Sequence, residues 1–586
     1  MRVGRVFRAY ATGSADVLAR SVKGRTRFRC AAWLSGNTHI GLLQDTLLRA
    51  RTPALPTRRP LFTRNARASL PRHQSIAATL NAQRAGLLGF CLAALLATVG
   101  CVSTNPGVDR ALSGLRTGND PVALAWSEKL KRSTYSQELG FVETGRVRML
   151  SGDFLGSSTN FAAVIDTVIE KTETGPALKL GDAGATVMAG TITDDRTRPY
   201  RLPAYEFIHA LQYQMLNHLF LGQRDAATVE ARRAVFAQDQ IAEKYGKEVE
   251  DARVQAASGS SSNSIGVVEG RMQGMAPVIE MTRSSYENGL AWYLSGLLLE
   301  EDKDQANAAL AYRKAWELIP GNPYVQKDFL RTLRTQDTEA FKTLAAQAGT
   351  DAAALTRAST ELILIVEEGF VPQRHSMKVP LPIGTAVVSV DFPFYQDPAH
   401  VPMTVEVMAN GRSCGLSAPA ISIQSLAYRD LKEKIPGVVV RNVTRATTRV
   451  VAQEAARHAG NDGVQAAVFL VTAVATAINK ADTRAWYTLP TVAHLYRGAC
   501  QPGEHTIELR NQVNGFVTRF PVKVAEGETR LVWVADLGGN SRIATTSLNG
   551  KGAPTAYHVC GSLQAGFPPV TLPGGPKTLY HVGTHP

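Results

Sequence analysis

One short stretch of this chain fits the pattern of a catalytic nucleophile. Gly411-Arg-Ser413-Cys-Gly415 matches the G-x-S-x-G nucleophile elbow of hydrolases. In that elbow a strand leads into the serine and a helix follows at once, which holds the hydroxyl on a sharp turn. A predicted strand precedes Ser413, but the proline at 419 disfavours a helix after it. The pair Asn410-Gly411 is a strong hairpin-turn signal and explains the first glycine without catalysis. We therefore expect no catalytic residue and no enzyme.

Asp482, Arg484 and Trp486 form the second group of side chains that could carry chemistry. An arginine can make a two-pronged pair with a carboxylate, and a tryptophan can cover an apolar surface. One interpretation is a contact with a ligand or partner. The other, which we favour, is an internal ion pair that locks a loop between a buried helix and the strands that follow.

A third charged group, Glu230, Arg232 and Arg233, lies on a predicted helix. Neighbouring residues of a helix are about 100° apart, so the two arginines point to different faces and do not make one patch. We expect a solvent-exposed helix face and a salt bridge to Asp194 or Asp195.

Metal and cofactor chemistry has little support in the sequence. The 12 histidines include no HExxH pair, and no P-loop or strand-linked dinucleotide-binding glycine motif occurs; residues 181–190 are a glycine-containing loop. The spacing of Cys414, Cys500 and Cys560 matches no zinc pattern. These cysteines predict either one disulfide with a thiol left over or buried thiols. We expect no cofactor and no bound metal.

Cys101 is the residue with the clearest predicted modification. Arg84 is followed by an apolar run over residues 85–99 and then by Gly100-Cys101, an arrangement that resembles a bacterial lipoprotein signal. The position three before the cysteine usually holds Leu and here holds Thr98. The apolar run has 15 residues, fewer than the ~20 that a spanning helix needs, so a transmembrane anchor is the less favoured alternative. The resemblance implies lipidation of Cys101 and, because no Asp follows it, the periplasmic face of the outer membrane.

The positive charge of the chain is concentrated in its leader. Residues 1–80 contain 15 Lys and Arg and two acidic residues, and Arg84 adds one more charge. Because the whole chain has a net charge of +14, the part from Cys101 on is neutral, and net charge gives no support for nucleic-acid binding. Met1 is the only methionine among the first 100 residues. We expect translation to begin near Leu80, with residues 1–79 a mis-assigned start; a true basic extension is the alternative.

A set of small and aromatic residues predicts a close helical hairpin. The set has the spacing of a tetratricopeptide repeat and consists of Trp292, Gly296, Ala308, Tyr312, Ala315 and Pro320. Its small residues let two antiparallel helices approach closely, and the proline ends the second helix. Further hairpins are expected over residues 205–239, turning at Gly222, and 138–171, turning at Gly152 with Phe161 inside. Inserts at 172–203 and at the Ser/Gly-rich 256–275 separate them, and we expect the second insert to be mobile.

Strand patterns begin after about residue 358. Residues 362–369 predict a buried strand, and 385–395 and 402–411 alternate as strands do. Helices are expected over 425–436 and 438–458, with a buried core helix over the apolar 463–479. Residues 503–510 and 519–536 predict a return to strands.

The predicted fold class is α+β and multidomain, with an all-α tetratricopeptide-like solenoid before a mixed part that ends in a small β-sandwich. The predicted parts are a leader and signal (1–100), a tether (101–125), helical repeats (126–350), a mixed strand and helix domain (358–500), a small antiparallel β-sandwich (501–560) and a Pro/Gly-rich tail (561–586).

Three stretches carry a resemblance to a known family. They are residues 194–206, residues 229–234, and residues 481–490 with the Pro-Gly-Glu-His of 502–505. Together they resemble uncharacterised bacterial outer-membrane-type lipoproteins with tetratricopeptide-like repeats, over roughly residues 125–540. The resemblance implies an envelope lipoprotein of unassigned function. Such proteins are often encoded beside lipoproteins that activate penicillin-binding proteins, which implies a link to peptidoglycan synthesis.

The sequence thus predicts a protein-interaction scaffold in the cell envelope. The groove of its helical repeats is expected to bind an envelope protein or peptide. Its lipid at Cys101 is expected to bind the membrane, and no nucleic-acid partner is expected. One alternative is an accessory protein whose strand part binds glycan or lipid. A cell-wall hydrolase is the less expected alternative.

Overall fold

The computed structural model describes residues 104–171, 195–257, 262–349, 355–383, 386–400, 402, 404–458, 480–513, 515–561 and 563–564. Several predictions lie outside these residues, namely the leader with Cys101, the loop at 181–190, the apolar segment 463–479 and the tail from 565 on.

The described chain mixes helices and strands, so the predicted α+β class is confirmed. The α-helices are α4 (Thr104–Thr117), α5 (Asp120–Lys131), α6 (Gln137–Leu150), α7 (Phe154–Lys171), α9 (Ala204–Phe220), α10 (Arg224–Ala257), α11 (Ser262–Arg271), α12 (Ala276–Ile279), α13 (Gly289–Glu301), α14 (Gln305–Leu318), α15 (Pro323–Gln336), α16 (Thr338–Gln347) and α17 (Ile423–His458). Two 3-10 helices are η1 (Asp195–Thr197) and η2 (Gln273–Met275).

Helices α4 and α5 occupy most of the stretch predicted to be a tether, so that prediction is wrong from Thr104 onward. Val108, Ala111 and Leu115 of α4 are fully buried, which is the spacing of one helix face. Burial of this face outweighs the poor helix propensity of the Gly and Ser residues around it. Proline is tolerated in the first turn of a helix, because the N–H groups there have no partner within the helix.

Three antiparallel helix pairs follow, α6/α7, α9/α10 and α13/α14. The first two turn at Gly152 and Gly222, as predicted, and both glycines have the positive φ that such a helix end requires. Helix α10 is longer than expected and takes in part of the Ser/Gly-rich insert. Another part of that insert forms α11, whose Val268 is fully buried. The prediction of a mobile insert is therefore wrong for residues 262–275.

The strands are β1 (Glu361–Glu368), β2 (His375–Ile383), β3 (Ala386–Phe394), β4 (Val405–Ala409), β5 (Arg412–Leu416), β6 (Ala418–Ser422), β7 (Val492–Ala499), β8 (Gly503–Asn511), β9 (Phe516–Val524), β10 (Thr529–Asp536), β11 (Asn540–Ser547), β12 (Ala556–Gly561) and β13 (Leu563–Gln564). They form a six-stranded sheet in the order β12-β11-β10-β1-β7-β6, a five-stranded sheet in the order β13-β9-β8-β4-β5, and the hairpin β2-β3. The central pair β1 and β10 is parallel.

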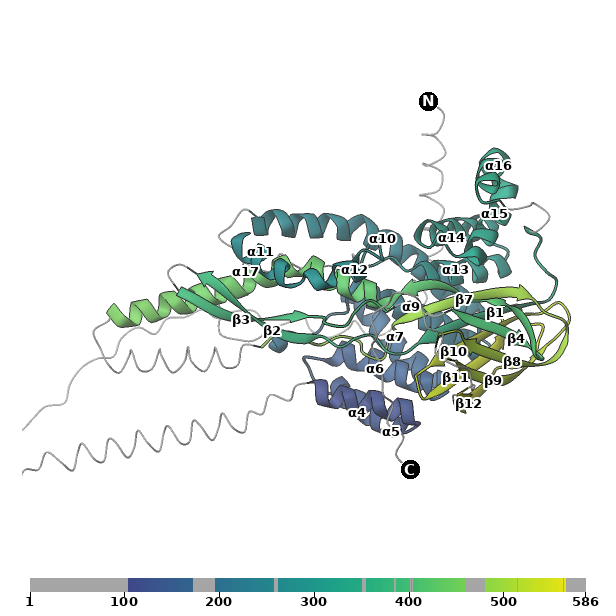
Figure 1. Ribbon diagram of the computed structural model, residues 1–586, viewed down its shortest axis with the longest axis horizontal. Helices are drawn as coiled ribbons and strands as arrows, with labels where there is room; N and C mark the ends of the chain where they lie inside the picture. The colour runs from purple at the N-terminus through teal and green to yellow at the C-terminus, as the bar shows by residue number, and fades with distance from the viewer. Residues whose placement is uncertain are drawn as a thin grey trace, which may run out of the picture. The chain divides into compact units, whose positions relative to one another are not determined.

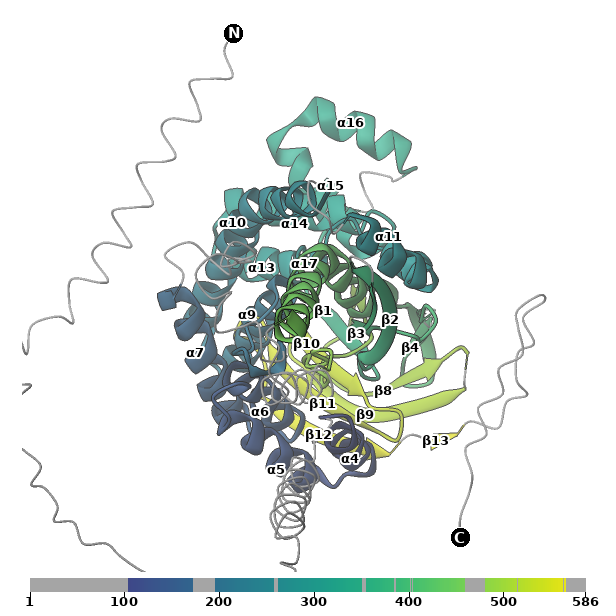
Figure 2. The ribbon, with the colours of Figure 1, turned by 90° about the vertical axis from the view of Figure 1, so that its left-hand side faces the viewer.

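The six-stranded sheet lies between the helices and the five-stranded sheet (Figure 2). Ile363 and Trp533 point toward the helices, whereas Leu364 and Val532, from the same two strands, pack with Phe520 of the five-stranded sheet. The predicted boundary at residue 500 does not separate these sheets, because each contains strands from both sides of it. The sequence cannot reveal such pairing, since the partner strands are far apart in the chain.

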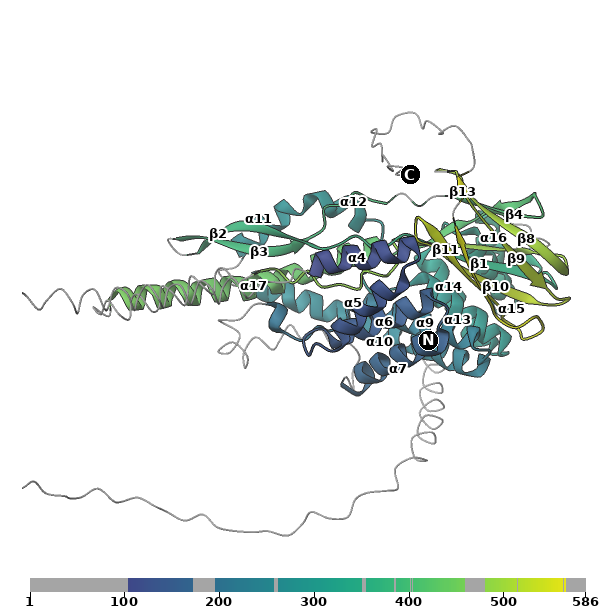
Figure 3. The ribbon, with the colours of Figure 1, turned by 90° about the horizontal axis from the view of Figure 1, so that it is seen from below.

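Helix α17 runs through Pro436 without a break, so the two separate helices predicted at 425–436 and 438–458 are wrong. An interior proline costs a helix about 3 kcal/mol. Ile435 and Val439, on either side of it, are fully buried, and this packing outweighs the cost. The helix runs alongside the hairpin β2-β3, and both extend away from the two large sheets (Figures 1 and 3).

Candidate functional site

The inner face of the helix pairs is the surface on which the sequence placed a binding groove. We define it by the first helix of each pair, α6, α9 and α13. Of their residues, 11 of 14 in α6, 16 of 17 in α9 and 12 of 13 in α13 are buried. A helix covered only by its hairpin partner keeps a solvent-exposed stripe. These helices must therefore be covered on the inner side as well.

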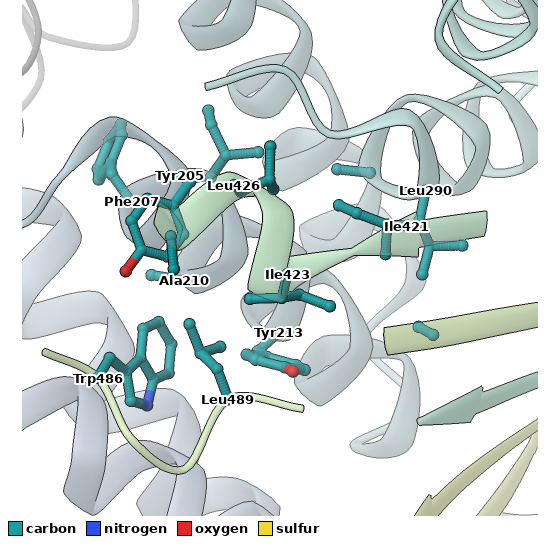
Figure 4. Packing of buried hydrophobic residues seen from close by; sticks show 14 of the residues in the cluster. Tyr205, Phe207, Ala210, Tyr213, Leu290, Ile421, Ile423, Leu426, Trp486 and Leu489 are labelled. Atoms are coloured by element: carbon teal, nitrogen blue, oxygen red, sulfur yellow. The ribbon is translucent and has the colours of Figure 1, made fainter. Parts of the chain in front are cut away.

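Two segments of the same chain cover the inner face. The first is the end of β6 and the start of α17, and the second is residues 484–489, which precede β7 (Figure 4). The contacting apolar residues include Tyr205, Ala210, Tyr213 and Leu290 from the helices and Ile421, Ile423, Leu426, Trp486 and Leu489 from the covering segments. The groove is thus filled by the chain itself.

Trp486 is the main apolar anchor of the second segment. Its side chain is fully buried, with ring centroids 5.7 Å from Phe161 and 5.9 Å from Tyr213. Its indole Nε1–H donates to the hydroxyl of Thr488 at 3.0 Å. A buried indole N–H needs such a partner. Residues 486 and 488 therefore stabilise each other inside the helical layer.

Two buried glutamates hold the backbone of the same segment, and we refer to Glu143 of α6 and Glu206 of α9 as the glutamate clamp. The Trp486 N–H donates to Glu206 Oε1 at 3.0 Å, and the Tyr487 N–H donates to Glu143 Oε1 at 2.7 Å. The Thr488 hydroxyl donates to Glu143 Oε2 at 2.5 Å. Two successive amides, at the start of the turn that Tyr487 and Thr488 form, are thus bound by side chains from two helices.

Burial sets the protonation of the clamp. It raises the pKa of Glu143 to about 8, although the hydrogen bonds from Thr488 and Tyr487 act in the opposite direction. Burial also raises the pKa of Glu206, which accepts hydrogen bonds from the hydroxyls of Tyr200 at 2.7 Å and Tyr205 at 3.0 Å. A buried carboxyl is tolerated when its oxygens are hydrogen-bonded, and both clamp residues meet this condition.

Asp482 and Arg484 form the internal ion pair that the sequence favoured, with 2.6 Å between Arg484 Nη2 and Asp482 Oδ2. The Arg484 side chain is 5% exposed and also donates to the backbone carbonyls of Tyr135 and Arg198. Because Arg484 and Trp486 are buried, these two residues are not accessible for the partner contact of the alternative interpretation.

The predicted repeat-packing set lies between α13 and α14. Trp292, Ala308, Tyr312 and Ala315 are buried, and Pro320 follows the end of α14. A Cβ at Gly296 would lie 2.8 Å from the ring of Tyr312, which is closer than carbon atoms approach in practice. The glycine is therefore required by the close contact between the two helices.

An ion network that the sequence did not reveal joins the last helix pairs to the six-stranded sheet. Arg497 of β7 contacts Asp328 of α15 at 2.6 Å and Glu361 of β1 at 2.7 Å. Arg331 contacts Glu300 at 2.6 Å. Burial alone would raise the pKa of Glu300 and Asp328, but pairing with Arg331 and Arg497 outweighs it and lowers both pKa values. The only local signal was Asp328 and Arg331, spaced i,i+3 on one helix face.

The remaining charged candidates have different partners from those expected. Arg232 contacts Asp302 at 2.6 Å, and Arg233 contacts Glu230 at 3.0 Å. The expected bridge to Asp195 is wrong, because that carboxylate pairs with Arg445 at 2.5 Å. Asp194 lies outside the described residues.

Ser413 is exposed and lies on β5, after a turn at Asn410-Gly411 in which both residues have positive φ. The next helix, α17, begins only at Ile423, so Ser413 is not on a strand-to-helix turn. Cys414, Cys500 and Cys560 are all free; Cys414 is exposed and the other two are half-buried. The predicted disulfide is therefore wrong, and the alternative of buried thiols is wrong for Cys414.

Comparison with protein-family models, curated proteins and solved structures found no match to this chain. Over the described ranges, no three or more His, Cys, Asp or Glu side chains come together as a group that could hold a metal ion. Over the same ranges, no helix is both long enough and apolar enough to cross a membrane.

Proposed function

We propose that this protein is a lipid-anchored scaffold of the bacterial cell envelope, held at the periplasmic face of the outer membrane by acylated Cys101. The arrangement of α6/α7, α9/α10 and α13/α14 as successive antiparallel pairs supports a tetratricopeptide-like solenoid. Repeats of this kind bind proteins, and the family resemblance adds a link to peptidoglycan synthesis.

The observation that decides which surface a partner could use is the self-filled inner face. With segment 484–489 held by the glutamate clamp, an external partner has to bind elsewhere on the helical repeats. The outer side of the second helices offers exposed apolar residues. Phe236 of α10 is 68% exposed and Val229, seven residues earlier on the same face, is 47% exposed. Arg232 of α10 contacts Asp302, just before α14, so α10 and the start of α14 adjoin. Partner binding is therefore assigned to the outer face.

A pull-down from envelope extract tests this assignment. The chain from Cys101 on is compared with its Phe236→Asp variant and with a Trp316→Phe control, which keeps an aromatic ring on α14. An envelope protein that is retained by the parent chain and the control but lost with Phe236→Asp supports the outer face. Partners retained equally by all three chains contradict it.

Anchoring is tested separately by fatty-acid labelling in cells. Cys101→Ser should abolish labelling and leave the precursor uncleaved, because the thiol is the acceptor of the lipid. Labelling that survives this substitution contradicts the lipoprotein assignment.

The alternative of a glycan-binding strand part has less support. The outward-facing residues of β8 and β9 carry charged pairs, such as Glu508 with Arg519 at 2.7 Å and Glu504 with Lys523 at 3.3 Å. On the described parts of these two strands, none of the residues facing outward is aromatic. Glycan sites usually need such a ring for stacking against the sugar. Sedimentation of the chain with purified cell wall is the control that tests this alternative.

A further inference from the structure

The end of α5 lies beside the start of α4, close to the predicted lipid. A Cβ at Gly114 would contact Val122, and a Cβ at Gly107 would contact Trp126 at 3.1 Å. Because the earlier residue of α4 lies beside the later residue of α5, the two helices are antiparallel along their lengths. Three residues further along each helix from the contact of Gly107 with Trp126, Lys129 lies beside Thr104, the first residue of α4. Cys101 precedes Thr104 by three residues, which span at most about 10 Å even when fully extended. With no long tether, whatever surrounds this end of α4 and α5 is held close to the membrane.

The surface at this end is basic and carries an exposed aromatic ring. We define the basic rim as Lys129, Arg132, Tyr135, Arg198 and Lys480, all of which are exposed, Tyr135 by 48%. Hydrogen bonds to backbone carbonyl groups connect the segments that carry Tyr135, Arg198 and Lys480. The Tyr200 N–H donates to the Tyr135 carbonyl at 2.8 Å, and Arg484 donates to the carbonyls of both Tyr135 and Arg198. Lys480 lies four residues before Arg484.

Three acidic residues next to the rim in the chain or in its hydrogen bonds are already paired within the fold. Glu128 contacts Lys131 at 2.9 Å, Asp195 contacts Arg445 at 2.5 Å, and Asp482 contacts Arg484 at 2.6 Å. For Lys129, Arg132 and Lys480, by contrast, the described part of the chain supplies no ion-pair partner. Among the described residues, Lys129, Arg132 and Lys480 of the rim therefore present positive charge with no ion-pair partner, although the chain from Cys101 on is neutral overall.

We propose that the basic rim rests on anionic phospholipid headgroups and forms a second membrane contact beside the lipid anchor. Lysine and arginine near an anionic bilayer each contribute attraction that decays within a Debye length, and tyrosine favours the interface between headgroups and water. A lipid chain combined with a basic patch gives more stable anchoring than either alone. The contact would also fix which side of the scaffold faces the membrane. This inference rests on the proposed lipidation only for its location in the cell.

Vesicle co-sedimentation tests the contact without the lipid. The probe is the unlipidated chain from residue 101 on, with Cys101→Ser, mixed with vesicles of phosphatidylcholine and phosphatidylglycerol at 3:1 or of phosphatidylcholine alone. We expect binding to the anionic vesicles only, weakening as salt is raised, because screening shortens the range of the attraction. Lys129→Gln with Arg132→Gln should weaken binding by roughly 25-fold, at about 5-fold for each charge. The matched control, Lys327→Gln with Lys342→Gln, removes two exposed charges from α15 and α16 and should change binding less than 2-fold.

Several outcomes overturn the proposal: no preference for anionic vesicles, equal losses in the rim and control variants, or binding insensitive to salt. Rim-dependent binding to an acidic protein in the extract, without vesicle binding, also overturns it. Because the probe carries no lipid, failure here leaves the lipidation of Cys101 standing. Fatty-acid labelling that is absent from the parent chain in cells, or that survives Cys101→Ser, contradicts the anchor; if vesicle binding is intact, the rim is left standing.

Discussion

Replacing Trp486 with alanine should destabilise the helices and the strands together. Trp486 lies in the segment that leads into β7, yet its ring is buried among Phe161 and Tyr213 of the helical layer. Removing the indole opens a cavity at this junction and frees the Thr488 hydroxyl from one of its two hydrogen bonds. The loss of stability therefore affects both the helices and the strands.

The size of the change in the free energy of unfolding follows from the full burial of Trp486. A buried Trp or Phe replaced by Ala typically costs 3–5 kcal/mol, and we expect about 4 kcal/mol here. The unfolding entropy is about 2.1 cal/mol/K per residue, which for about 400 ordered residues gives roughly 0.8 kcal/mol/K. If the described chain unfolds as one body, Trp486→Ala should lower the Tm by about 5 °C.

Thermal unfolding followed by limited proteolysis with mass spectrometry can measure this. Peptides from α6 and α9 and peptides from β7 and β10 should all become sensitive over the same lowered temperature range. Trp316→Ala is the control. Trp316 of α14 is half-buried and stacks on Phe329 of α15, with 4.7 Å between the ring centroids. Its loss should therefore lower the Tm by only about 2 °C.

Two results would refute this reasoning. One is a Tm for Trp486→Ala within 1 °C of the parent value, which would mean that the ring is not packed as described. The other is early exposure of the helical peptides while β7 and β10 remain protected, which would mean that the segment does not couple the two parts.

Three further predictions concern other parts of the structure. Ala308→Leu should cost ~1–3 kcal/mol by forcing α13 and α14 apart, whereas Ala306→Leu, exposed on the same helix, should cost under about 0.5 kcal/mol in a urea titration. Burial raises the pKa of Glu143 from its ordinary value near 4.5 to about 8, so between these pH values the folded protein holds a proton that the unfolded chain has released. Stability should therefore fall as pH rises from about 4.5 to about 8 and level off above that. Glu143→Gln, which mimics the protonated acid, should remove this contribution from the pH dependence of Tm. Cys414 should react first with a thiol reagent, since it is exposed and the other two thiols are half-buried, and mass mapping of the labelled peptides checks this.

Local features of the fold were predictable from the sequence. Gly152 and Gly222 marked helix turns, and Asn410-Gly411 marked a strand hairpin, because each needs a positive φ that few residues tolerate. The buried strand β1 followed from a short apolar run. These signals depend only on neighbouring residues.

Helix α4 was missed for a local reason as well. Its Gly, Ser and Pro residues suggested a flexible tether, while the buried face formed by Val108, Ala111 and Leu115 was present in the sequence and carried the opposite signal. The periodic apolar spacing was the better indicator, since helices in proteins are stabilised mainly by burying such a face.

The buried charges could not have been predicted from local pattern. Glu143 and Glu206 occur on helices where a glutamate is ordinarily solvent-exposed. Their partners, the backbone N–H groups of Tyr487 and Trp486, lie in a distant part of the chain. Long-range strand pairing has the same difficulty, because β1 pairs with β10 far later in the chain. For this reason the groove appeared open in the sequence and is filled in the structure.

Hydrogen exchange at residues 484–489 tests most directly whether the inner face is permanently filled. In the chain from Cys101 on, the amides of Trp486 and Tyr487 donate to the glutamate clamp and should exchange as slowly as those of the central strand β10. Mass spectrometry of the peptide that covers these residues would report the protection. Exchange within seconds, at the rate of an exposed loop, would contradict the account and restore an open groove.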